Sequence, residues 1–136
     1  MATTTATLTL SSGDLTGDAL SLSTTTQLTK AGSNTGLDQT TGVARKFFES
    51  TQSNTALIAA ADYTDDKAHK VYIKNISSTA SEYITVKIGA TEVGRLYAGD
   101  FLFMPWSADT TGTAADIDID TSAVNMTVEY IVIYEA

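Results

Sequence analysis

Few residues of this chain could do chemistry. It has one histidine, His69, and no cysteine, which excludes a thiol nucleophile, a disulfide framework and a zinc or iron–sulfur site with cysteine ligands. His69 could act as a general base or bind a metal, but no Gly-x-Ser-x-Gly elbow and no second histidine accompany it. We therefore expect His69 to lie at the surface or at a strand edge, without a catalytic role.

Three alternating carboxylates, Asp116, Asp118 and Asp120, have the most suggestive spacing, because hard cations bind through several carboxylate oxygens. On a strand they would share one face, with Ile117 and Ile119 on the other, and successive aspartates would lie about 6–7 Å apart. The glycine and terminal glutamate of a calcium-binding loop are missing. We expect a solvated polar face that binds no metal tightly; the alternative is a calcium site.

A second carboxylate pair, Asp14 and Asp18, lies in a glycine-rich stretch and resembles the pair of a glycosidase only superficially. Glycosidases need two carboxyl groups whose different environments separate their pKa values. One exposed turn at 11–18 does not provide such an asymmetry. We therefore predict no catalytic residue, no cofactor-binding residue and no metal ligand.

Composition limits the partners that the chain can bind. Its 136 residues fit one domain, and its net charge of −8 disfavours both nucleic acid and an anionic membrane surface. No apolar run approaches the roughly 18 residues of a membrane span. The 24 threonines and 12 serines make up about a quarter of the chain, and these residue types favour strands and turns.

The pattern of apolar residues predicts short strands throughout. Strict alternation of polar and apolar residues is typical of half-buried strands, and it recurs at intervals of about 8–12 residues, the spacing of a sandwich or barrel. The expected strands lie at 5–10, 19–23, 43–49, 56–61, 70–76, 83–88, 92–97, 101–104, 116–120 and 125–134. The segment 56–61 is also compatible with a helical turn, but the flanking Thr55 and Tyr63 favour the strand.

We thus predict an all-β fold: a single-domain antiparallel β-sandwich, jelly-roll-like, with nine or ten short strands over residues 1–136. A threonine-rich hairpin or arm at about 1–42 contains a long loop at 24–42, and another loop is expected at 107–114. The arm is a candidate for contacting neighbouring subunits. The expected core contains Ile117, Ile119, Val128, Tyr130 and Val132.

Two segments, 101–106 and 128–134, are apolar on both strand faces. A strand of an antiparallel sandwich should be apolar on one face only, so these segments need a second covering surface. That surface is either the chain's own 24–42 loop or another subunit. The candidate interface residues, shared between the core and a subunit contact, are Phe101, Phe103, Met104, Trp106, Ile131 and Ile133.

The C-terminal half, roughly 71–135, resembles small virion structural proteins of tailed bacteriophages. The recurring scheme is a strand ending in Lys74-Asn75, a turn, a short strand at 83–88, then Ala98-Gly99-Asp100-Phe101-Leu102-Phe103-Met104-Pro105, and a final strand with Val128-Glu129-Tyr130. Such proteins include capsid decoration (cement) proteins with a jelly-roll or related β-sandwich, which are often trimeric. Tail and fibre components also belong to this group.

The resemblance implies a binding protein rather than an enzyme. The expected partners are the major capsid protein and further copies of the chain, in a homotrimer on the capsid exterior of the virion, after synthesis in the host cytoplasm. The alternative is a tail or fibre component that binds a carbohydrate or receptor. Trp106 and Tyr97 would then form its stacking platform, which requires an exposed Trp106.

Overall fold

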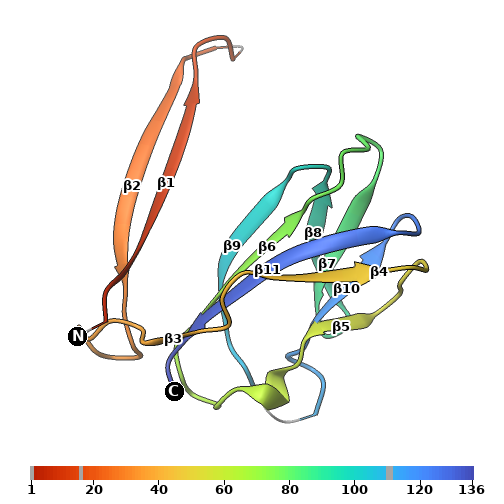
Figure 1. The fold of residues 1–136 in the computed structure, drawn as a ribbon. Helices are drawn as coiled ribbons and strands as arrows, with labels where there is room; N and C mark the ends of the chain where they lie inside the picture. The colour runs from red at the N-terminus through yellow and green to blue at the C-terminus, as the bar shows by residue number, and fades with distance from the viewer. Residues whose placement is uncertain (1, 16, 110–111) are drawn as a thin grey trace.

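The computed structural model describes residues 2–15, 17–109 and 112–136 of a chain built almost entirely from strands (Figure 1). Thr16, in the expected turn, and Thr110 and Thr111, in the expected 107–114 loop, lie outside the described residues. The strands are β1 (Thr4–Ser12), β2 (Leu20–Leu28), β3 (Gln39–Thr40), β4 (Ala44–Phe48), β5 (Thr55–Ile58), β6 (His69–Asn75), β7 (Tyr83–Ile88), β8 (Thr91–Tyr97), β9 (Phe101–Trp106), β10 (Ile117–Thr121) and β11 (Met126–Tyr134).

Two antiparallel sheets form the sandwich. One has the order β5-β10-β7-β8, and the other has the order β3-β11-β6-β9, with β4 also paired to β11. The described residues thus confirm the predicted antiparallel sandwich, with eleven strands in place of nine or ten. Among these residues no helix is long and apolar enough to cross a membrane.

The core lies between the inner faces of the two sheets, where every second residue of a strand is buried. Ile117 and Ile119 of β10 face Val128 and Val132 of β11, and all four are fully buried. Tyr130 is half-buried and packs against this core. The alternation read from the sequence therefore identified the inward-facing side of both strands correctly.

The segment at 56–61 combines both structures that its sequence allows. It begins as the short strand β5 and continues, after Ala59, as the 3₁₀ turn η1 (Ala60–Asp62). At the start of the turn, the backbone N–H of Ala60 donates a buried hydrogen bond of 2.8 Å to Oδ1 of Asp116. That contact comes from a residue 56 positions away, so local propensity alone could not predict it.

Outside the sandwich, β1 and β2 form an extended two-stranded hairpin (Figure 1). We call residues 4–28 the arm. Its register runs unbroken from Thr4 opposite Leu28 to Ser12 opposite Leu20. The prediction of two joined strands is confirmed, but the expected 24–42 loop is wrong over Thr24–Leu28, which continues β2. Those threonines pair across the arm, as in the Thr7–Thr25 hydroxyl hydrogen bond of 2.9 Å.

Candidate interaction surface

The outer face of the five-stranded sheet carries a group of apolar side chains with Lys70 and Lys74 beside them, and this group is most exposed along β9. Phe101 and Phe103 point outward from β9 and are 57% and 43% exposed. In register beside Phe103 lies Tyr72 of β6, and beside Tyr72 lies Ile131 of β11. Ile133 follows on the same side of β11. We call these residues, Tyr72, Phe101, Phe103, Ile131 and Ile133, the outer face.

Alternation along β9 divides the six candidate interface residues. Phe101, Phe103, Ile131 and Ile133 belong to the outer face, whereas Met104 packs against the core and Trp106 is buried within it. The indole Nε1 of Trp106 donates a hydrogen bond to the carbonyl of Ala115 at 2.8 Å. The first four are thus available to a partner, and the last two hold the sandwich together.

The proposed sugar-stacking platform is not present. Trp106 is 5% exposed, so its ring cannot stack on a saccharide. Tyr97 lies on β8 of the other sheet, where it pairs with Tyr83 at a ring distance of 5.3 Å. The carbohydrate-binding alternative, which requires an exposed Trp106 beside Tyr97, is therefore disfavoured, because alternation turns Trp106 inward.

A small charged group borders the outer face. Glu129 accepts hydrogen bonds from Arg45 Nε at 2.9 Å and from the Tyr72 hydroxyl at 3.3 Å. The pKa of Tyr72 is raised mainly by burial and, to a smaller extent, by the negative charge of the nearby Glu129. The Tyr72 hydroxyl therefore stays protonated at neutral pH and continues to donate its hydrogen bond to Glu129. This hydrogen bond holds the Tyr72 ring in place on the outer face.

The arm is amphipathic across its thickness. Because side chains alternate along each strand, one face carries serine and threonine hydroxyls and the other carries apolar groups. The apolar side, which we call the leucine face, consists of Ala6, Leu8, Leu10, Leu20 and Leu22 with Thr24 and Thr26. Its leucines are 40–45% exposed, which is high for such large side chains. The alternation at 5–10 and 19–23 was recognised in the sequence, but its consequence was missed: the exposed leucines of both strands gather on one face, with Ser12, Thr24 and Thr26 among them.

A groove of about 650 Å³ separates the leucine face from the outer face. Leu8 and Leu10 line it on the arm, and Tyr72, Phe101 and Phe103 line it on the sheet. The two apolar walls face each other without closing, so neither covers the other. The expected alternative, in which the chain's own segment 24–42 covers both apolar faces, is therefore not realised at Phe101 and Phe103.

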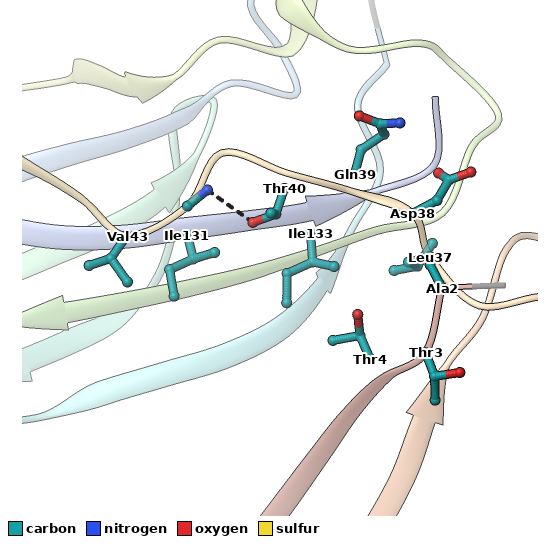
Figure 2. Close-up of a pocket in the computed structure, with 11 residues that line it drawn as sticks. Ala2, Thr3, Thr4, Leu37, Asp38, Gln39, Thr40, Val43, Ile131 and Ile133 are labelled. Atoms are coloured by element: carbon teal, nitrogen blue, oxygen red, sulfur yellow. Dashed lines mark hydrogen bonds between the residues drawn. The ribbon is translucent and has the colours of Figure 1, made fainter.

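A second hollow, of about 420 Å³, lies at the base of the arm (Figure 2). Ile131 and Ile133 line it from β11, together with Leu37 and Val43. A hydrogen bond of 3.0 Å from the Gly42 N–H to the Thr40 hydroxyl shapes the connecting segment beside them. The chain's own residues 37–43 thus flank the isoleucines of the outer face, while its phenylalanines remain open.

The base of the arm is anchored to the sandwich. Leu28 and Leu37 are buried, and the Leu37 N–H donates to the Leu28 carbonyl at 2.9 Å. Glu135, next to the end of β11, accepts the Ala31 N–H at 3.0 Å. At Gly36 a Cβ atom would lie 2.2 Å from the Ala2 carbonyl oxygen, so a larger residue there would disrupt the base. The Leu37–Leu28 and Gly36–Ala2 contacts lie within the base itself, and the Ala31–Glu135 hydrogen bond joins the base to the end of β11.

The aspartates around β10 have separate structural roles. Asp116 is buried, just before the strand, and accepts the Ala60 N–H. Asp120 is half-buried and forms an ion pair with Lys87 at 2.6 Å, and it accepts the Asn54 N–H at 2.7 Å. Burial alone would raise the pKa of Asp120, but these two contacts lower it.

The expectation of a uniformly solvated stripe at these positions is therefore wrong. Asp118 is also half-buried, and its pKa is raised by burial and then by the Asp116 charge. Within the described residues, no group of three or more histidine, cysteine, aspartate or glutamate side chains is arranged to hold a metal ion. Asp14 and Asp18 lie exposed near the tip of the arm, where the Ser12 hydroxyl donates to Asp14 at 2.7 Å.

His69 is buried rather than superficial, which corrects the sequence-based expectation. It lies on β6 between two other strands and is 1% exposed. Tyr63 and Trp106 contact its ring edge-on at centroid distances of 5.5 and 5.6 Å, and Tyr134 stacks at 6.4 Å. Among the described residues neither ring nitrogen has a hydrogen bond of ordinary geometry, and the nearby Lys67 backbone opposes only part of the effect of burial on the His69 pKa. Burial lowers the pKa of His69, so the ring is neutral at pH 7.

The stability of the protein should therefore fall on mild acidification. Because the folded pKa of His69 is below its ordinary value of 6.5, the unfolded chain binds more protons between these two pH values. The contribution of His69 to the free energy of unfolding is complete above about pH 6.5 and is lost as the pH falls toward the folded pKa. Thermal unfolding from about pH 8 to about pH 5 should show a falling midpoint.

The matched control for this measurement is His69→Phe, which keeps an aromatic ring and removes the titration. Tyr63, Tyr134, Lys67, Lys70 and Glu135 surround the site and remain in both proteins. The midpoint of the variant should decline less over the same pH range. Parallel declines in the two proteins would show that other carboxyl groups cause the acid sensitivity.

Comparison with protein-family models finds no match to the chain, and comparisons with curated proteins and with solved structures find none either.

Proposed function

We propose that this chain is a structural protein of a tailed-phage virion that decorates the head shell. It would bind the major capsid protein and further copies of itself on the capsid exterior, and it would perform no chemistry. The observation that carries the proposal is the exposed pair Phe101 and Phe103 on the outer face, beside a protruding arm whose two strands carry no charge. The location of the protein on the capsid, rather than elsewhere in the virion, is proposed from the resemblance of residues 71–135 to virion proteins.

Apolar burial supports self-association. Each large apolar side chain that becomes covered contributes about 1.5–3 kcal/mol, and association costs about 4–15 kcal/mol in lost freedom. Several partly exposed leucines and phenylalanines on each copy are enough to offset that cost. A closed cyclic arrangement would also leave no apolar patch to drive open-ended aggregation. The threefold symmetry of the proposed homotrimer comes from the resemblance, not from this arithmetic.

Stabilisation of a shell by such a protein requires only many repeated weak contacts. When one trimer contacts several capsid subunits, each contact raises the effective concentration of the next, so the combined binding exceeds any single contact. The net charge of −8 suits a protein that is added to the outside of the shell, away from packaged nucleic acid. The burial of His69 among aromatic rings supports the assignment of no catalytic role.

The proposal is tested by counting copies of the chain in purified virions with quantitative mass spectrometry. Hundreds of copies per particle would support a decoration protein, since a shell presents its binding sites by icosahedral repetition. About six to a few dozen copies would place the chain in the tail and favour the receptor-binding alternative. Absence from the particles would contradict a virion role altogether.

A further inference from the structure

The arm lacks the features that normally protect a two-stranded ribbon from association. Among the described residues, β1 and β2 pair only with each other, so both strands are edges. Natural edge strands are usually guarded by charged residues, proline or bulges. The nine residues of each strand contain neither a charge nor a proline, and their register has no bulge. An edge of this kind is suited to contact with another protein surface.

In this structure the arm leaves the groove over its own sheet open, and the hydrogen bond from the Ala31 N–H to Glu135 joins its base to the end of β11. Leu28 and Leu37 are buried at this base, and Gly36 has no room for a side chain. Figure 1 shows the tip of the arm rising beyond the sandwich. At about 3.4 Å per residue, nine residues span about 30 Å. The arm is thus long enough to reach across a neighbouring molecule.

We propose that the arm of a second copy of this chain packs its leucine face against the leucine face of this arm around Leu20 and Leu22, which do not line the groove. Two such ribbons, each with its leucines on one side and mostly hydroxyls on the other, form a small two-layer sandwich about 10 Å between layers. This inference rests on the self-association in the proposed function, but neither on the capsid as partner nor on the threefold symmetry, because a pair of arms is a twofold contact.

Three observations favour a second copy as the occupant. The contact requires a ribbon that is apolar on one face, and the arm itself is such a ribbon. A symmetric pair uses the same patch on both molecules, so one self-complementary face is sufficient. Finally, copies of a chain with a net charge of −8 repel one another over most of their surface. The two strands of the arm carry no charged residue, so two arms can pack together without burying a charged side chain.

The chain has no cysteine, so single-cysteine variants can map the contact by disulfide formation under mild oxidation. One series replaces leucine-face residues, Leu8→Cys, Leu10→Cys, Leu20→Cys and Leu22→Cys. The matched series replaces their neighbours on the hydroxyl face, Thr7→Cys, Thr9→Cys, Ser21→Cys and Ser23→Cys. All eight positions are exposed, and circular dichroism of each variant would verify that it folds.

We expect at least one leucine-face variant to form about five times more covalent dimer than any hydroxyl-face variant, because a disulfide requires Cα atoms within about 7 Å. Equal yields from the two series would overturn the inference. The double variant Leu8→Cys/Phe103→Cys adds a second check: quantitative intramolecular disulfide in a monomer would show that the arm closes on its own sheet. The virion copy number does not depend on these results, so this inference and the capsid proposal can fail separately.

Discussion

Replacing Trp106 with alanine is expected to lower the free energy of unfolding by about 3–5 kcal/mol. The indole is buried between the two sheets and contacts the rings of Tyr63 and His69. Its removal leaves a cavity and also deprives the buried Ala115 carbonyl of its donor. Denaturant unfolding followed by circular dichroism would measure the loss, and an unchanged slope with denaturant would show that the transition remains two-state.

The control is Phe101→Ala, which removes another large aromatic ring from the same strand. Phe101 is 57% exposed on the outer face, so its loss leaves no internal cavity. We expect its effect on the unfolding of the isolated chain to be within about 1 kcal/mol. A loss as large as that of Trp106→Ala would mean that another part of the chain covers the outer face in solution.

Placing charges on the leucine face is expected to abolish self-association. Leu10 and Leu22 lie directly opposite each other on the arm. Because the two leucines are 42% and 45% exposed, covering their remaining surface contributes about 1–3 kcal/mol per copy, and each 1.4 kcal/mol changes a dissociation constant about tenfold. With both copies changed, the dissociation constant should rise by at least about tenfold. Sedimentation velocity at micromolar concentration should show an oligomer for the original chain and a monomer for Leu10→Asp/Leu22→Asp.

A control with the same added charge is available on the other side of the arm. Thr9 and Ser23 also lie opposite each other, one residue along from the first pair, and their side chains point the other way. Thr9→Asp/Ser23→Asp should remain largely associated. If both double variants dissociate, charge repulsion rather than the leucine face governs assembly. An original chain that sediments as a monomer and binds no hydrophobic dye would contradict the interface itself.

Local pattern was sufficient to predict much of the sandwich. Alternation in 116–120 and 125–134 placed Ile117, Ile119, Val128 and Val132 on inner faces, and all four are fully buried. This works because successive side chains of a strand point to opposite sides, so polarity along the sequence reports directly on burial. The same rule identified both strands of the arm, although it ended β2 too early, where a run of threonines shows no alternation.

Prediction failed where a long-range contact decides the environment of a polar side chain. The lysines beside His69 suggested a surface position, yet its alternation with Val71 and Ile73 places it on the inner face. Asp116 was expected to be solvated, but it is buried because the Ala60 N–H supplies a distant partner. In both cases, whether a polar group tolerates burial depends on which groups tertiary folding brings to it.

The sequence by itself determined the class of fold, the inner faces of its central strands and the surplus of apolar residues at 101–106 and 128–134. Only the tertiary structure decided how that surplus is divided: Trp106 and Met104 inward, Phe101 and Phe103 outward. It also decided that the arm stands apart with its leucines uncovered. The physical reason is that strand alternation is a local, period-two property, whereas coverage of a face depends on segments far apart in the chain.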